Sequence, residues 1–335
     1  MTKNISEKIK EVNVLMTFFI VALHVFAWDE RMWPLRPLVN MAVPIFFVIS
    51  SYLYFQNWSF NWICYKKKIV RRFFSLYIPF VVYNGLYIPF IFIKTYIIHA
   101  TDTRQLSVLS VEMITNILFG IPEIPNPVLW FIQVLLIFSI VAPIMGFIIK
   151  ISKWSYLIIL AVCFIYTPYL HYTSFLYWIP CISLGIFIAF YEKNIKTFIN
   201  ILNTKTYKYL IISLSIAYLF FFSYILRNED IYTSPYYYLY RMTVPIIMIP
   251  FFFSFHHCSQ NSVISNILPY TFPIYCMHVP FVNFSVISLS KLINQEYFIF
   301  IQLLALILSF TLVLIFCKTL SHIKPLWRIL SGNRY

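Results

Sequence analysis

The sequence is poor in charge, in glycine and in paired cysteines. Only 11% of its 335 residues are charged and 61% are apolar, whereas a typical soluble domain carries about 25% charged residues, so a water-soluble fold is hard to sustain. The five glycines predict that helices pack mostly through large side chains rather than through close small-residue contacts. The six cysteines are scattered and none forms a CxxC pair, which argues against a disulfide framework or a zinc site.

Carboxylates are also missing from the middle of the apolar segments. Every Asp and Glu falls at the end of an apolar run or in a connecting loop. Many ion-coupled transporters hold their ions on acids buried in the membrane, and glycoside hydrolysis uses two carboxylates. The sequence argues against both activities.

What the sequence does contain is a series of apolar runs of roughly 16 to 22 residues, a length suited to helices that span a bilayer. The runs lie at residues 12–28, 39–55, 73–94, 128–149, 155–170, 175–191, 209–226, 239–255, 268–288 and 298–317. We therefore predict an all-α, polytopic integral membrane protein with about ten transmembrane helices. It forms a single transmembrane domain over residues 1–335.

Lysine and arginine are unevenly divided between the loops on the two sides. With ten spans both termini share one side, and that side carries 18 of the 25 Lys and Arg residues, against 7 on the other. The positive-inside rule then predicts that both termini are cytoplasmic, in the cell (inner) membrane. The net charge of +14 is explained as a topology signal, and because it is spread over many short loops, nucleic acid is not expected as a partner.

Histidines are the ionisable residues that lie deep in the predicted spans. His24 is in the first span and His278 in the ninth, and a rise of ~1.5 Å per residue places both roughly 15 to 18 Å above the cytoplasmic end. Two imidazoles at similar depth suggest one polar cavity, and histidine takes and returns a proton near neutral pH. Each could instead only bridge two helices through a hydrogen bond. His256 and His257, beside Cys258, lack the spacing of a tetrahedral site, so no metal is expected.

A basic cluster stands immediately before the third span. It consists of Lys66, Lys67, Lys68, Arg71 and Arg72. Such a cluster can fix the orientation of the chain or attract anionic lipid headgroups. It can also hold the phosphates of a cofactor at a cavity mouth while the reactive end of that cofactor reaches up between the helices.

Five segments, in the expected order, carry a resemblance to a known family. They are Val14–His24 (VLMTFFIVALH), Val43–Phe55 (VPIFFVISSYLYF), Lys68–Asn84 (KIVRRFFSLYIPFVVYN), Leu129–Phe131 (LWF) and Ile274–Pro280 (IYCMHVP). They resemble the first helix ending in histidine, the VPxFFxxSGxLxF helix, the basic entry with its IPY-type turn, the tryptophan motif and the IYxxHxP motif of the membrane-bound acyltransferase family 3. This family includes O-acetyltransferases of bacterial surface polysaccharides.

The resemblance implies an O-acyltransferase. It would move an acetyl or other short acyl group from acyl-CoA, as donor substrate, to a hydroxyl of a surface polysaccharide or other glycan, with no permanently bound cofactor. His24 corresponds to the histidine regarded as essential in the family, and we expect it to act as the base. His278 would orient the acceptor or share the proton relay, or it could be purely structural. A transient acyl-histidine is a further possibility.

The resemblance also suggests binding residues. We expect Lys68, Arg71 and Arg72 to hold the phosphates of CoA, with Arg72 the best match to a family arginine. Trp130, Ser50 and Arg241 are the candidate substrate-binding residues. Arg241 ends the stretch Tyr236–Arg241 (YYYLYR), which predicts an interfacial aromatic anchor from which the arginine snorkels outward.

The chain departs from the family pattern at several positions. Asn13 stands where the family usually has Arg or Lys, 11 residues before the first-helix histidine, and Lys10 is a candidate substitute one turn earlier. Ser50-Ser51 replaces the usual Ser-Gly, and Ser75 replaces a second arginine after the basic entry. These changes concern the donor contacts more than the acyl-transfer chemistry.

Two other functions stay open from the sequence. A membrane glycosyltransferase using lipid-linked sugars would depend on Asp29 or Glu30 in the first outer loop and not on His24. A polysaccharide-precursor transporter would move its substrate without consuming acyl-CoA, although no buried acid supplies a coupling ion.

Overall fold

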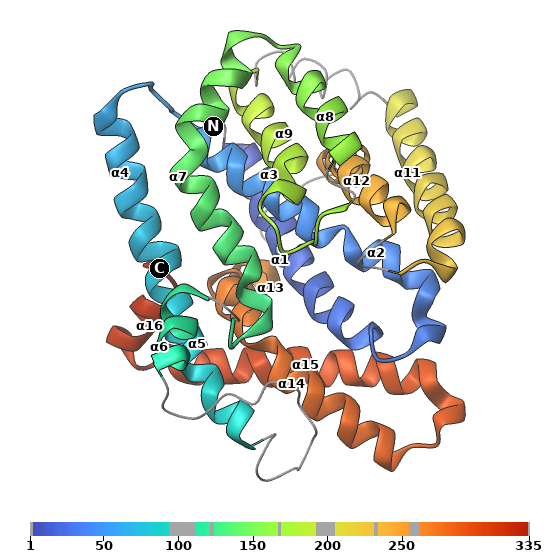
Figure 1. Cartoon of the computed structure of the whole chain (residues 1–335). Coiled ribbons are helices and arrows are strands. Elements are labelled where there is room, and N and C mark those ends of the chain that lie inside the picture. Colours follow the sequence, from blue (N-terminus) through green and yellow to red (C-terminus); the bar gives the residue numbers. More distant parts are fainter. Residues whose placement is uncertain are drawn as a thin grey trace.

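A computed structural model describes residues 3–93, 111–120, 124–166, 169–191, 205–230, 234–254 and 262–333 of the chain (Figure 1). These residues form helices and the turns that join them, and no strand occurs among them. The predicted all-α class is confirmed.

The helices vary widely in length. The longer ones are α1 (Lys3–Phe26), α3 (Ala42–Phe55), α4 (Trp62–Arg72), α5 (Ile78–Phe92), α7 (Trp130–Ile151), α8 (Ser155–Tyr166), α9 (Ile179–Phe190), α11 (Lys205–Ile225), α12 (Pro235–Ser254), α14 (Thr271–Leu292) and α15 (Phe298–Ser321). The shorter ones are α2 (Arg36–Asn40), α6 (Val111–Phe119), α13 (Ser262–Ile267) and α16 (Lys324–Leu330). Short 3-10 turns are η1 (Glu30–Leu35), η4 (Pro127–Leu129), η6 (Leu176–Trp178), η7 (Leu226–Asn228), η8 (Leu268–Tyr270) and η9 (Gln295–Tyr297). A π-helix, η2 (Phe73–Tyr77), joins α4 to α5.

Seven helical segments of the described chain are long and apolar enough to cross a membrane. They are Ile5–Phe26, Glu30–Phe55, Trp62–Phe92, Pro127–Ile151, Tyr207–Asn228, Val263–Leu292 and Gln295–Ser321. The predicted spans at 155–170 and 175–191 correspond to shorter apolar helices, Ser155–Tyr166 and Leu176–Phe190, and the span at 239–255 corresponds to α12. The structure therefore supports a multi-pass membrane protein. The count of ten spans and the cytoplasmic side of the termini stay predictions.

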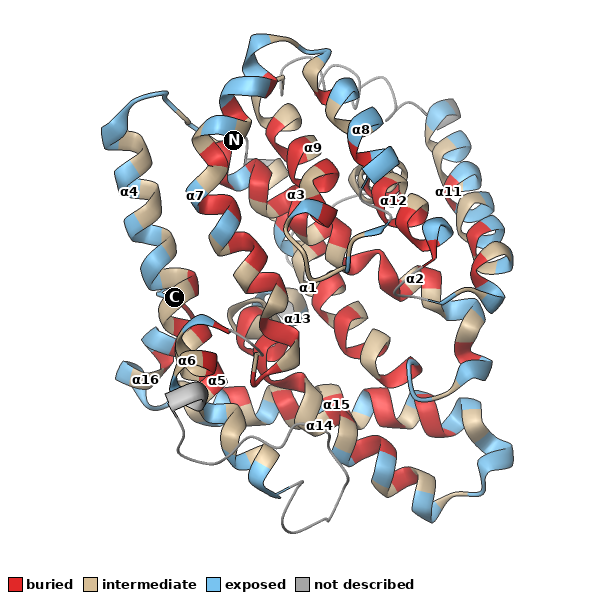
Figure 2. Ribbon diagram, in the orientation of Figure 1, coloured by how far each residue is buried: buried red, intermediate tan, exposed pale blue. Residues whose placement is uncertain are grey.

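Buried side chains concentrate on the helices at the middle of the molecule. Helix α3 packs against α9, α14 against α15, and α1 against α14. Figure 2 shows buried residues running along α1, α3 and α9, while α4 and α11 at the edges are largely exposed. The contact between α1 and α14 matters for function, because these helices carry His24 and His278.

Helices α3 and α9 approach each other closely at Gly185 of α9. A Cβ built there would lie 2.0 Å from the Ser51 Oγ and 2.3 Å from the Val48 carbonyl oxygen, both on α3. Ser51 is fully buried, and its hydroxyl donates to the Phe47 carbonyl at 2.8 Å. The expectation of packing through large side chains does not hold at this contact, where a glycine lets two helix backbones meet.

We expect Gly185→Ala to lower the melting temperature of the purified protein. The added methyl group would clash with the backbone of α3, which can move only if the helix shifts. Overpacking of this kind costs about 1–3 kcal/mol. Thermal denaturation followed by size-exclusion chromatography measures the shift. Gly85→Ala in α5 is the matched control, since a Cβ there meets no atom of the described residues within 4 Å. An unchanged melting temperature for Gly185→Ala would contradict the close packing of α3 on α9.

Candidate active site

Two histidines from distant parts of the chain lie side by side. His24, two residues before the end of α1, and His278 of α14 have ring centroids 4.7 Å apart, with ring planes inclined by 54°. His278 is fully buried. The imidazoles that the sequence placed at one depth therefore belong to one site.

His278 is held by one ring nitrogen and leaves the other open. Its Nδ1 lies 2.8 Å from the Tyr275 carbonyl oxygen. Because a carbonyl oxygen only accepts, Nδ1 carries the proton and donates it to this hydrogen bond. The Nε2 atom is then a lone-pair nitrogen, and it is buried with no hydrogen-bond partner among the described residues. An unpaired buried acceptor costs about 1–3 kcal/mol, so this position favours a ligand that donates a hydrogen bond.

Asn126 supports the helix turn that carries His278. Pro280 lies inside α14 and has no N–H to donate to the carbonyl of Cys276, four residues earlier. The Asn126 side-chain amide donates to that carbonyl at 2.8 Å, and Asn126 is fully buried. Asn126 is not among the residues that the sequence motifs indicate. The signal that points to it is Pro280, because a proline inside a membrane helix frees a carbonyl that needs a donor from elsewhere.

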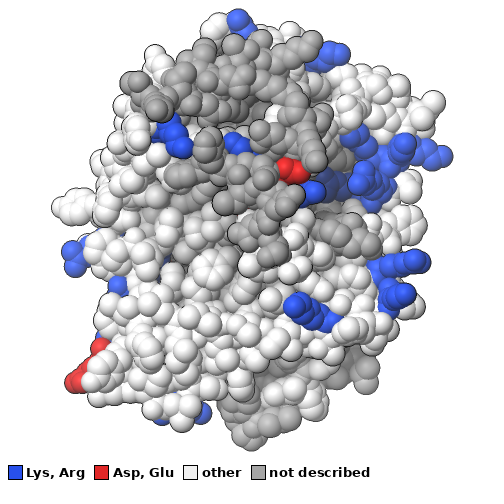
Figure 3. All heavy atoms as spheres, turned by 180° about the vertical axis from the view of Figure 1, so that it is seen from behind, with Lys and Arg blue, Asp and Glu red and all other residues white. Residues whose placement is uncertain are grey.

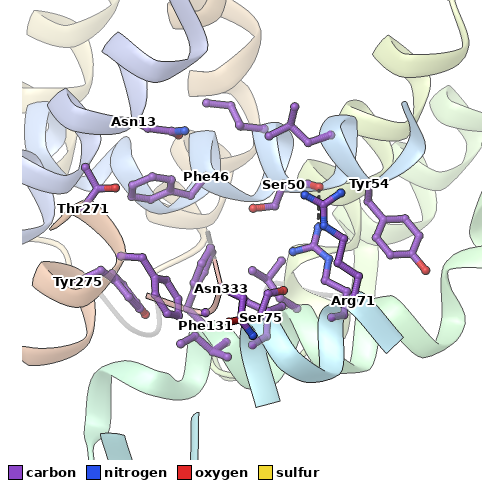
Figure 4. A pocket seen from close by; sticks show the side chains of 18 of the residues that line it. Asn13, Phe46, Ser50, Tyr54, Arg71, Ser75, Phe131, Thr271, Tyr275 and Asn333 are labelled. Carbon is purple, nitrogen blue, oxygen red and sulfur yellow. Dashed lines mark hydrogen bonds between the residues drawn. The ribbon is translucent and has the colours of Figure 1, made fainter. Parts of the chain in front are cut away.

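A cavity of about 770 Å³ lies beside the same turn of α14, a volume typical of small-molecule sites. Three cations of one helix, Lys68, Arg71 and Arg72 of α4, line its cationic end. The rest is mostly apolar and aromatic, lined by Phe46, Ile49, Phe131, Leu135, Phe272 and Tyr275 among others. Figure 4 shows side chains around the space that come from α1 (Asn13), α3 (Phe46), α4 (Arg71), α7 (Phe131) and α14 (Tyr275). The cavity thus suits a ligand with an anionic end and a less polar one.

The cavity and the histidine pair lie along the same helix faces. On α1, Thr17 lines the cavity, and His24 follows two turns later on the same face, roughly 10 Å further along the axis. On α14, Tyr275 lines the cavity and its ring centroid lies 6.3 Å from that of His278. Neither histidine is itself part of the cavity wall. His24 and His278 therefore lie further along the same faces of α1 and α14 that line the cavity.

The predicted phosphate-binding residues differ in their partners. Lys68 Nζ donates to the carbonyl oxygens of Tyr54 and Gln56 at the end of α3, where a cation offsets the helix dipole. Arg72 donates to the Ser50 carbonyl at 3.4 Å. Arg71 lines the cavity, is exposed, and forms no hydrogen bond or ion pair within the described chain. Arg71 is thus the cation with the most donors available to a ligand.

The departures from the family pattern fall on the cavity wall. Asn13, Ser50 and Ser75 all line the cavity, and Figure 4 shows Asn13 at the side of the cavity away from Arg71. Lys10, the candidate substitute for a basic residue at position 13, is exposed and does not line the cavity. The positive charge of the cavity therefore comes from α4, and Figure 3 shows basic side chains gathered on the edge that carries α4.

The turn after α16 forms part of the cavity wall. The sequence motifs do not indicate this turn. Gly332 has a φ of 66° and Asn333 a φ of 54°. The Asn333 N–H donates to the Arg328 carbonyl at 2.8 Å and the Gly332 N–H to the Ile329 carbonyl at 3.0 Å, which is a Schellman turn. A Cβ at Gly332 would lie 2.5 Å from the Ser75 carbonyl oxygen. The turn therefore packs directly on the π-helix η2, and both its residues line the cavity.

Trp130 and Arg241 lie away from this cavity, in an aromatic cluster. Trp130 stacks on Trp178 with ring centroids 5.8 Å apart. Arg241 is only 6% exposed, and its Nη1 donates to the Tyr177 hydroxyl at 2.9 Å. The prediction that Arg241 snorkels outward is wrong, because the rings of Tyr177 and Tyr237 hold its guanidinium inside the protein.

The side chain of Asp29 is bonded to Arg31, two residues later in the chain. Its Oδ1 accepts from the Arg31 backbone N–H at 2.9 Å, and its Oδ2 lies 2.7 Å from Arg31 Nη2. The hydrogen bonds from the Arg31 side chain hold the pKa of this carboxyl below its usual value. Asp29 therefore begins η1 as a cap rather than standing free as a base. His256, His257 and Cys258 lie outside the described residues.

A multi-pass helical protein in which a half-buried and a fully buried histidine meet next to a cationic cavity has the parts of a membrane enzyme for group transfer. The acyltransferase domain family matches residues 14–320, and the chain therefore belongs to the membrane acyltransferase family 3, as the five motifs suggested. No curated protein and no solved structure matches the chain.

We expect Lys68→Met to destabilise the protein by about 1 kcal/mol, because the carbonyl groups at the end of α3 lose a charged hydrogen-bond donor. Arg71→Met is the matched control on the same helix and should leave the melting temperature unchanged, since Arg71 bonds to no described residue. Thermal denaturation of both purified variants tests this difference. Equal melting temperatures for the two variants would remove the structural role of Lys68.

Proposed function

We propose that the chain is an O-acyltransferase that moves an acetyl or other short acyl group from acyl-CoA to a hydroxyl of a surface polysaccharide or other glycan, at the cell (inner) membrane. Family membership supports acyl transfer. The observation that carries the proposal is the His24–His278 pair, with its unpaired Nε2, next to a cavity with a cationic end.

The cavity fits the chemistry of an acyl-CoA donor. Arg71 and Arg72 at its polar end bind phosphate oxygens through paired, charge-assisted hydrogen bonds, with Lys68 adding charge nearby. The apolar walls at Phe46 and Phe131 hold the less polar arm of the donor. The shared faces of α1 and α14 direct the thioester toward His24.

The reaction needs a base, and His24 supplies it. His24 takes the proton from the acceptor hydroxyl as the hydroxyl oxygen attacks the thioester carbonyl carbon. Collapse of the tetrahedral intermediate breaks the carbon–sulfur bond, and the sulfur leaves with the proton from the imidazolium, giving the O-acyl product and free CoA. The unpaired Nε2 of His278 accepts a hydrogen bond from the His24 ring or from the acceptor, which orients the reacting groups.

The acceptor approaches from the side of Trp130. The half-buried aromatic side chains of Trp130 and Tyr172 offer apolar surface to the C–H face of a sugar ring, while the polar edges of such rings hydrogen-bond. The two rival functions have less support. A glycosyltransferase would need Asp29 or Glu30 as its acid, and the structure shows Asp29 bonded to Arg31. A transporter would leave the histidine pair without a chemical role.

We expect His24→Ala to abolish O-acylation. The measurement is mass spectrometry of the acetyl groups on the surface glycans of a deletion strain complemented with the wild-type chain or the variant at matched expression. Acetyl groups restored by the wild type but not by the variant support His24 as the base. Equal restoration removes His24 from the chemistry, and no acetyl change in any strain points to another acyl group, another acceptor or one of the rival functions.

Arg71→Met should weaken CoA binding ~10-fold or more, because a charge-assisted phosphate contact is worth about 1.5–3 kcal/mol. Calorimetric titration of the purified protein with CoA measures the dissociation constant. Lys10→Met is the control, since Lys10 does not line the cavity. Equal CoA affinity in Arg71→Met and wild type would place the phosphates elsewhere.

Asp29→Asn distinguishes the acyltransferase from the glycosyltransferase. We expect this variant to keep O-acylation within about twofold of wild type, because the amide oxygen still caps η1. The same glycan mass spectrometry measures it. Loss of activity in Asp29→Asn together with full activity in His24→Ala would favour the glycosyltransferase.

A further inference from the structure

Helix α4 carries cations on two sides. Lys68 and Arg72 are half-buried and donate to backbone carbonyls of α3. Lys66 and Lys67 are exposed on the other side of the helix and do not line the cavity. Within the described chain neither of these two lysines forms a hydrogen bond or an ion pair. Figure 2 shows α4 at the edge of the molecule, where exposed residues recur along its length.

Exposed apolar side chains flank the two lysines on the same side of the helix. Trp62 and Ile63, one turn before them, are 70% and 79% exposed. Phe73 and Phe74, about two turns after them, are exposed as well. Spacings of three and four residues place all of these side chains on one face. The two ammonium groups therefore lie on a face that is apolar on either side of them along the helix.

Contacts with α7 place this face beside a helix that is long enough to span the membrane. The Tyr65 hydroxyl donates to the Ile140 carbonyl at 3.1 Å, and Ile140 is the eleventh of the 22 residues of α7, counted from Trp130. A helix of that length extends about 33 Å, which is close to the thickness of the hydrocarbon core. Ile144 and Ile151, further toward the end of α7, are exposed. The apolar outer surface of α7 therefore continues past the level of the lysines.

The elements around α4 supply no carboxylate. Helix α4 packs mainly against α7 and η2, and none of these three elements contains Asp or Glu. The sequence has no acidic residue between Glu30 and Asp102. Exposed cations beside apolar, membrane-facing surface are costly unless an anion pairs with them. Within the described chain Lys66 and Lys67 have no such anion, so the surroundings have to supply it.

We propose that Lys66 and Lys67 bind the phosphate group of an anionic phospholipid of the surrounding bilayer, while Phe73 and Phe74 contact its acyl chains. Two adjacent ammonium groups donate charge-assisted hydrogen bonds to the phosphate oxygens. A zwitterionic lipid carries a cation of its own and balances less of this charge. Trp62 lies on the same face, and tryptophan is typical of the membrane interface. This lipid site is separate from the cavity and does not depend on the proposed acyl transfer.

Quenching by brominated lipids measures the preference at the site itself. The full chain is reconstituted in phosphatidylcholine vesicles with increasing fractions of brominated phosphatidylglycerol, or of brominated phosphatidylcholine with the same acyl chains. Bromine quenches nearby tryptophans, and the difference between the wild type and Trp62→Phe isolates the signal of Trp62, one turn from Lys66. We expect the anionic lipid to bind beside Trp62 ~10-fold or more tightly than the neutral lipid. Equal quenching of Trp62 by the two lipids overturns the inference.

Paired substitutions then assign the preference to the two lysines. Lys66→Gln combined with Lys67→Gln should abolish the preference, whereas Lys66→Arg combined with Lys67→Arg should keep it. The matched control is Lys150→Gln combined with Lys153→Gln, which removes the same two charges from exposed lysines at and after the end of α7. This control should keep the preference, because its lysines do not lie on the face that carries Trp62. A full preference in the folded Lys66→Gln, Lys67→Gln protein overturns the inference.

The single variants decide the case if the double variant does not fold. Lys66→Gln and Lys67→Gln should each lose part of the preference, and a full preference in both would overturn the inference. A role of these lysines in orientation alone predicts equal quenching by the two lipids. Lipid binding needs no acyl transfer, so a lysine-dependent preference in a protein without acyltransferase activity would support the lipid site and reject only the proposed function.

Discussion

The lack of water inside a bilayer means that each backbone carbonyl there needs a donor from the protein. Pro280 creates such a carbonyl at Cys276, and the Asn126 amide satisfies it. The hydroxyl of Tyr275 donates to the Val128 carbonyl beside it. These two contacts join the segment before α7 to the turn of α14 that carries His278 and one wall of the cavity. The positions of His278 and of the cavity wall at Tyr275 depend on this junction.

The helical class and the two histidines deep in their spans could be predicted from the sequence. The rings of His24 and His278 lie 4.7 Å apart, which agrees with the similar depth expected for them, although α1 begins at Lys3 and α14 at Thr271, at different distances from the two rings. The rings meet because α1 and α14 pack on each other at these positions. Hydropathy locates apolar runs, whereas the packing of two helices depends on side-chain contacts that one sequence does not display.

The contacts of the basic residues also depend on tertiary packing that the sequence does not display. A run of basic residues before a helix was recognised as a possible phosphate site, but the sequence could not show that Lys68 serves the end of α3 while Arg71 faces the cavity. The interfacial location expected for Arg241 followed from its tyrosine-rich neighbours. Those same tyrosines, together with Tyr177 from a segment more than sixty residues earlier, enclose it instead. Whether an aromatic residue anchors a helix at the surface or covers a buried charge depends on the tertiary fold.

The Schellman turn at Gly332 and Asn333 has a consequence for how the protein is made. The cavity wall combines Asn13 of α1 with Asn333, which lies beyond the last helix and beyond the region that defines the family. A ribosome has therefore translated nearly all of the described chain before this wall can close over η2. The α1–α14 contact can form earlier, so the histidines can meet while the cavity is still open on one side. The order of synthesis thus allows the two histidines to meet before the last part of the cavity wall is in place.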